Sequence, residues 1–145
     1  MTKIYSDEKI KYYLDVLLDK TIKDLKEENK NIDIPVGELS GYIRHLGFLF
    51  DNDNLLFLFS LINFLPSIYY SVRTRLETKR TEAEKEEEKE INKQLKELNR
   101  ISKEIFMETL EKFKEILSKN DENEMIKLFK EAHIKMLKDI FNKFR

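Results

Sequence analysis

All three glycines of the chain, and one of its two prolines, lie within residues 31–50. Both residue types interrupt helices, glycine through its backbone freedom and proline through its missing N–H. Residues 84–118 contain neither and can continue as one helix. The distribution predicts long helices in the second part of the chain and a module of a different kind before them.

Residues 84–118 have the pattern of one long amphipathic helix. Apolar side chains recur every three or four positions, and Lys and Glu fill the rest. The apolar positions are Ile91, Leu95, Leu98, Ile101, Ile105, Phe106, Leu110, Phe113 and Leu117. The run 82–90 has no large apolar residue, so it is a solvated helix start or, for part of its length, a frayed linker.

Two further helices are predicted around this one. Asp121 and Glu124 have the spacing of a capping box and open a helix over 121–144. Its apolar positions are Ile126, Phe129, His133, Met136, Ile140 and Phe144. Pro66 is expected in the first turn of another helix, in which Ile68, Val72 and Leu76 follow at intervals of four.

The N-terminal third has two interpretations. Residues 7–28 fit a helix, through Ile10, Leu14, Leu17 and Leu18, but Tyr12, Leu14, Val16 and Leu18 also alternate as in a strand. The window 31–50 then suggests a strand ending at Pro35, a short helix capped by Gly47, and a second short strand. An irregular helical corner of an all-α bundle is the alternative.

We therefore expect a mainly α protein: a helical bundle with long amphipathic helices at 54–145, preceded by a small N-terminal α/β module at 1–53. The segment 54–72 contains 19 consecutive uncharged residues, close to the length of a membrane span. Asn63, Pro66 and two serines favour a buried core or interface segment instead.

Composition excludes several classes of function. The 145 residues carry a net charge of −1, with no Cys and two His, so neither a disulfide framework nor a thiolate metal site is expected. The near-neutral charge predicts no general attraction to nucleic acid. The N-terminus lacks the order of a secretion signal, so export is not expected and a cytoplasmic location is.

Enzymatic signals are weak. The chain has no glycine-rich phosphate loop, no nucleophile elbow and no metal-spaced pair of histidines. His45 and His133 fit packing or surface roles better than catalysis. We expect no enzyme, no metal and no cofactor.

Two groups of residues are candidates for binding. The first is apolar and is assigned to burial against another subunit, because a chain this small has limited interior for it; it consists of Phe57, Phe59, Ile62, Phe64, Tyr69, Phe113 and Leu117. The second is basic and could contact nucleic acid or an acidic partner, with an ordinary solvated face as the alternative; it consists of Arg73, Arg75, Lys79 and Arg80.

The order of these features resembles the subunits of GINS, the four-part replication factor of archaea and eukaryotes, in the type that carries its small domain before the helical one. The matching segments are IDIP at 32–35, YIRHLGFLF at 42–50, LPSIYY at 65–70, and the helical segments 97–117 and 122–141. The resemblance implies a non-catalytic scaffold in DNA replication that joins sister subunits and bridges the replicative helicase to a nuclease-like partner.

A second resemblance leads elsewhere. The small helical subunit of type III CRISPR effector complexes also places proline, tyrosine and arginine in a central helix, as LPSIYYSVRTR does at 65–75. It implies contact with the nucleic-acid backbone. An unrelated helical interaction protein is the third interpretation.

Overall fold

The computed structural model describes residues 8–27, 53–119 and 121–144, with side chains except those of 8–11, 13, 14, 53–64 and 122. These residues form α1 (Glu8–Lys26), α3 (Asp53–Glu82), α4 (Lys85–Lys119) and α5 (Glu122–Met136), followed by a π-helical turn, η1 (Leu137–Phe141). Within the described ranges the fold is almost entirely helical and contains no strand. The predicted helical bundle is confirmed.

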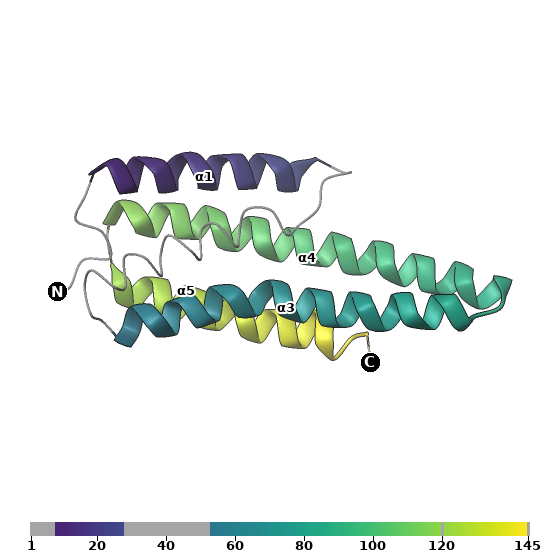
Figure 1. Ribbon diagram of the computed structural model, residues 1–145. Helices are drawn as coiled ribbons and strands as arrows, with labels where there is room; N and C mark the ends of the chain where they lie inside the picture. Colours follow the sequence, from purple (N-terminus) through teal and green to yellow (C-terminus); the bar gives the residue numbers. More distant parts are fainter. Residues whose placement is uncertain (1–7, 28–52, 120, 145) are drawn as a thin grey trace.

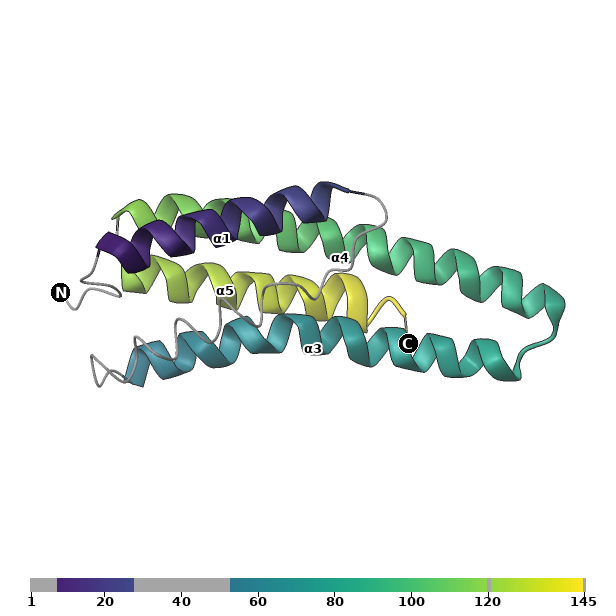
Figure 2. The same ribbon diagram turned by 45° about the horizontal axis from the view of Figure 1, so that its top comes forward.

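The long helices α3 and α4 form an antiparallel hairpin, and α5 returns along it (Figure 1). Figures 1 and 2 both show the hairpin extending past the ends of α1 and α5. The connection between α3 and α4 is only Ala83 and Glu84. The run 82–90 is therefore mostly helix, with a short break that matches the predicted linker in part.

The core forms where the apolar stripes of α3, α4 and α5 meet. Ile68, Val72 and Leu76 are buried on α3, at the intervals of four that the sequence predicts. On α4 the predicted stripe is buried at most of its positions, and on α5 Phe129 and Met136 are buried. The helices are thus held by their amphipathic faces rather than by intrinsic propensity.

Pro66 lies inside α3, not in the first turn of a helix. The prediction that a helix begins there is wrong. Interior proline removes one backbone hydrogen bond and costs about 3 kcal/mol. Leu65 and Ile68 on either side of it are buried, so tertiary packing offsets a cost that local propensity would not accept.

The helix predicted at 121–144 changes its winding near the end. Asp121 accepts hydrogen bonds from the backbone N–H groups of Asn123 and Glu124, which confirms the predicted N-cap. Beyond Met136 the chain widens into η1, where the N–H of Asn142 reaches the carbonyl of Leu137 at 2.9 Å. In an α-helix, side chains four residues apart differ in direction by about 40° around the axis. A π turn has more residues per turn, so it reduces this drift and keeps side chains four residues apart on the buried side.

The N-terminal part of the chain is described only in α1. Because α1 covers most of residues 7–28, the helical interpretation of this segment is correct and the strand interpretation is not. Leu18 is fully buried whereas Val16 is 49% exposed, although a strand would place both on one face. The two predicted strands and the short helix of the α/β module lie outside the described residues, and the division at residues 53 and 54 remains a prediction.

None of the helices in the described ranges is long and apolar enough to cross a membrane. The uncharged stretch 54–72 lies within α3, which continues for two to three further turns of polar sequence.

Candidate functional site: charged faces of the hairpin

The four basic residues predicted as one contact surface lie on two sides of α3. About 200° around the helix axis separates Arg73 from Arg75. Arg80 follows Arg73 by seven residues and shares its side, whereas Lys79 follows Arg75 by four and shares the other. The buried stripe of Val72 and Leu76 runs between the two sides. The cations therefore form two pairs that flank the core rather than one patch.

The first pair is occupied by contacts within the chain. Nε of Arg73 donates to Oε1 of Glu77 at 3.0 Å, one turn along α3. This hydrogen bond raises the pKa of the Arg73 guanidinium above its ordinary value. Nη1 of Arg80 donates to Oδ1 of Asn92 at 3.2 Å and so joins α3 to α4 near the end of the hairpin.

Arg75 differs from its neighbours. Its Nε and Nη2 atoms are shielded from solvent, and no hydrogen-bond acceptor among the described residues reaches either atom. These two nitrogens form the edge of the guanidinium that binds a carboxylate or phosphate with two parallel hydrogen bonds. Lys79, on the same side of α3, is exposed. Arg75 and Lys79 are thus the two cations of the predicted basic group for which the described residues provide no hydrogen-bond or ion-pair partner.

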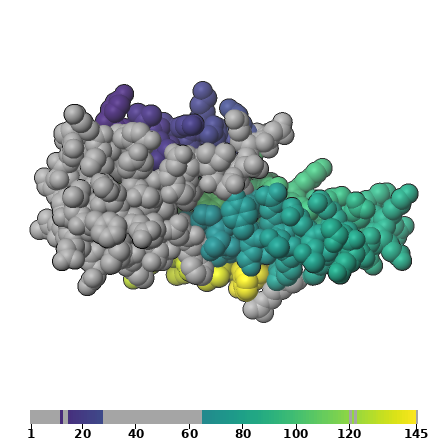
Figure 3. Space-filling view, in the orientation of Figure 1, coloured from purple at the N-terminus to yellow at the C-terminus, as the bar shows by residue number. Residues whose placement is uncertain are grey.

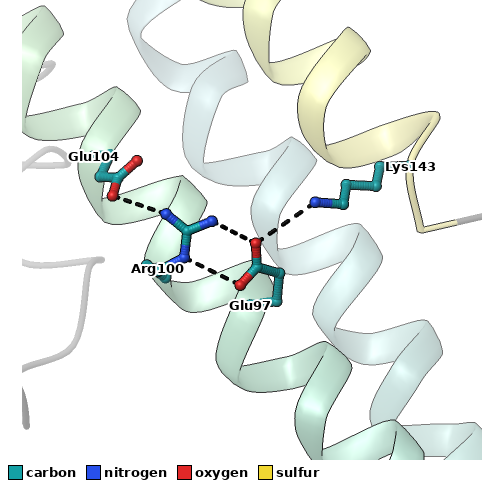
Figure 4. A network of polar contacts seen from close by, with 4 residues as sticks. All are labelled: Glu97, Arg100, Glu104 and Lys143. Atoms are coloured by element: carbon teal, nitrogen blue, oxygen red, sulfur yellow. Dashed lines mark hydrogen bonds and ion pairs between the residues drawn. The ribbon is translucent and has the colours of Figure 1, made fainter.

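A second charged cluster links α4 to the C-terminal end of the described chain (Figure 4). Arg100 binds Glu97 through Nε and Nη2 and binds Glu104 through Nη1 at 2.9 Å. Nζ of Lys143 lies 3.5 Å from Oε1 of Glu97. The hydrogen bonds from Arg100 lower the pKa of the Glu97 carboxyl, and Glu97 in turn raises that of Arg100. All four side chains are well exposed, so the network adds little stability.

A third cluster joins α4 to α5. The carboxylate of Glu108 accepts hydrogen bonds from Nζ of Lys112 at 3.0 Å and from Nζ of Lys135 at 3.3 Å. Both bonds lower the pKa of Glu108. The three side chains border a cleft of about 100 Å³, whose floor includes Ile105 and Leu128. Small-molecule sites usually need several times this volume.

The residues assigned to subunit burial divide into two sets. Tyr69, Phe113 and Leu117 are buried within this single chain. Tyr69 bonds Asn99 of α4, and the Phe113 ring packs edge-on against Phe129 of α5 with centroids 5.1 Å apart. The other set lies on α3, but its side chains are outside the described residues; it consists of Phe57, Phe59, Ile62 and Phe64.

Sequence reasoning missed three large apolar side chains that are exposed among the described residues. Tyr12 is 72% exposed and Val16 is 49% exposed, four residues apart on the outer face of α1. Ile134 of α5 is 59% exposed. The helical interpretation of residues 7–28 could have predicted the exposure of Tyr12 and Val16, because it places them on the side of the helix away from Leu18 and Leu25.

Among the described residues, no group of His, Asp and Glu side chains is arranged to hold a metal ion. His133 is half-buried on α5. Comparison of the chain with models of protein families, with curated proteins and with solved structures gave no match.

Proposed function

We propose that this chain is a non-catalytic structural subunit that binds partner proteins through its helical faces. One observation carries the proposal: the end of the α3–α4 hairpin, residues 77–90, projects past the other helices, and none of its side chains is buried. We call these residues the arm. Figure 3 shows it as a narrow extension of the molecule.

The chemistry of the arm suits a partner surface better than a substrate site. Arg80 of the arm bonds Asn92 just beyond it on α4, and the exposed positions of the arm are mostly Glu with some Lys. Projecting charged helices steer and orient association with a complementary, basic surface. Small-molecule sites, in contrast, are usually concave and lined mostly by apolar side chains.

The resemblance to GINS supports a more specific version of the proposal. In this version the chain is one subunit of the GINS complex in DNA replication, and it scaffolds the replicative helicase and a nuclease-like partner. The likeness in the order of sequence features supports this version. The bundle formed by α3, α4 and α5 is compatible with it.

The test is purification of the tagged full chain from its native cell. Stoichiometric replication subunits among the co-purifying proteins are the expected result, whereas a chain that elutes alone would contradict the proposal. A variant of the arm with Glu86→Gln, Glu87→Gln and Glu88→Gln should lose partners. The matched variant with Glu115→Gln, Glu124→Gln and Glu131→Gln, on exposed positions of α4 and α5, should retain them.

A second candidate function is contact with a nucleic-acid backbone, as in the small CRISPR subunit. The free donors of Arg75 and the exposed Lys79 favour it, because phosphate is a natural ligand for both. Binding to single-stranded RNA or DNA that weakens steeply with salt, and that disappears when Arg73, Arg75, Lys79 and Arg80 are all replaced by Glu, would support this function over the first.

A further inference from the structure

Among the described helices, α1 has a single neighbour. The helices α3, α4 and α5 each pack against the other two, whereas α1 packs against α4. In Figure 1, α4 lies between α1 and the pair formed by α3 and α5. Removal of α1 would therefore leave the contacts among the other three helices in place.

The surface of α4 beneath α1 is a row of five residues at intervals of four and three: Lys103, Met107, Leu110, Lys114 and Leu117. We call it the α1-facing row. Its two lysines contact α1, since Nζ of Lys103 donates to the carbonyl of Glu27 at 2.9 Å and Nζ of Lys114 binds the carboxylate of Asp19. Residues on one helical row face the same way, so Met107 and Leu110 also face α1. Leu110 and Leu117 are buried and Met107 is half-buried.

The polar contacts at the edges of this interface are exposed. The side chains of Lys114 and Asp19 are about half exposed. Nζ of Lys26 lies 3.9 Å from Oε1 of Glu111, and these two side chains are also at least half exposed. Exposed ion pairs add little stability and are screened by salt. They do, however, define a charge pattern, because α1 places the acidic Asp19 beside Lys114 and the basic Lys26 beside Glu111.

We propose that α1 is a displaceable cover, and that the α1-facing row is a docking site for an amphipathic helix of a partner protein. The occupant has the chemistry of α1 itself, with an apolar stripe such as that of Leu18, Ile22 and Leu25, an acid placed for Lys114 and a base placed for Glu111. When α1 leaves, Leu110 and Leu117 become available to this helix. The inference rests on the proposed binding role of the chain and specifies one of its surfaces.

Hydrogen exchange on the full chain tests the displacement. Amides of α1 should exchange at least about tenfold faster than the buried amides of α4, because α1 opens without the other helices. Raising the ionic strength from about 0.01 M to about 1 M, which shortens the Debye length from about 30 Å to about 3 Å, should accelerate α1 selectively. Exchange of α1 and α4 at a common rate would overturn the inference.

A fluorescent peptide with the sequence of residues 8–27 tests the docking site. Its apparent affinity for the full chain is reduced by the fraction of molecules in which α1 is docked. Leu18→Ala weakens the docking of α1, and the peptide should bind this variant at least about tenfold more tightly than the wild type. Val16→Ala, at an exposed position of the same helix, should leave binding unchanged.

A locked chain completes the design. The sequence has no cysteine, so Asp19→Cys and Lys114→Cys can be joined by a short bismaleimide without side reactions. The locked chain should not bind the peptide, whereas the same variant with its thiols capped singly should bind it. Equal binding by both forms would overturn the docking site. If the locked chain still captures its cellular partners, this inference fails while the proposed function is retained.

Discussion

The hydroxyl of Tyr69 donates a hydrogen bond of 2.5 Å to Oδ1 of Asn99, and so joins α3 to α4 across the hairpin. The Tyr69 ring is 4% exposed and also packs edge-on against Tyr70, with centroids 5.1 Å apart. This residue therefore has a defined role inside the chain, whether or not a partner approaches it.

Tyr69→Phe tests that role, because it removes the hydroxyl and keeps the ring. We expect the free energy of unfolding to fall by about 1 kcal/mol, the usual net value of one such hydrogen bond. Urea denaturation of Tyr69→Phe, Asn99→Ala and the double variant gives the coupling energy between the two positions. Purely additive effects would contradict a direct bond.

Phe113 is fully buried against Phe129, so its replacement should affect folding directly. We expect Phe113→Ala to lower the free energy of unfolding by about 3–5 kcal/mol through lost burial and the cavity left behind. Ile134→Ala removes an exposed side chain and should change stability by less than about 0.5 kcal/mol. If Phe113→Ala instead unfolds like the wild type, Phe113 belongs to an intermolecular interface and not to this core.

The helical periodicity of the second half of the chain was sufficient to predict α4 and the N-cap at Asp121, because both depend on local sequence. Pro66 was misinterpreted for the same reason. The local preference of proline favours a helix start. The helix continues through Pro66 because Leu65 and Ile68 pack into the core, and no local sequence pattern reveals this packing. The π turn after Met136 was not predicted either.

The candidate site was less predictable than the fold. Four basic residues within eight positions read as one patch along the sequence, but a helix distributes them around its axis. Whether each cation has a hydrogen-bond partner then depends on where the acceptors lie. Glu77 is one turn along the same helix from Arg73, whereas Asn92 reaches Arg80 only because α4 folds back along α3. Contacts of the second kind require the tertiary structure.

Glu108 makes the packing of α4 on α5 dependent on pH. Its pKa is lowered from an ordinary value of 4.5 by hydrogen bonds from Lys112 and Lys135. A carboxyl with a lowered pKa stabilises the fold at pH values above 4.5, and this contribution disappears as the pH falls through the lowered pKa. Because the pair is half exposed, the contribution is below about 1 kcal/mol.

We therefore expect Glu108→Gln to be less stable than the wild type at pH 7, and the difference to vanish in strong acid. Urea denaturation at a series of pH values between neutrality and pH 2 measures it. Glu115→Gln, which neutralises an exposed carboxylate on the same helix, is the matched control. A difference between Glu108→Gln and wild type that does not change with pH would show that the two hydrogen bonds do not depend on the charge of Glu108.

Arg75 provides the sharpest test of whether the basic residues of α3 serve structure or binding. Leaving its Nε and Nη2 donors shielded without an acceptor among the described residues costs stability. Arg75→Met keeps the apolar stem and removes the donors, so the free energy of unfolding should rise by about 1 kcal/mol. Arg73→Met, which loses the hydrogen bond to Glu77, should instead lower the free energy of unfolding slightly.

Urea denaturation compares the two variants. A loss of stability in Arg75→Met would mean that the Arg75 guanidinium already has a partner within the chain. A gain would mean that the isolated protein retains an unfavourable buried charge, as expected of a side chain whose acceptor comes from another molecule.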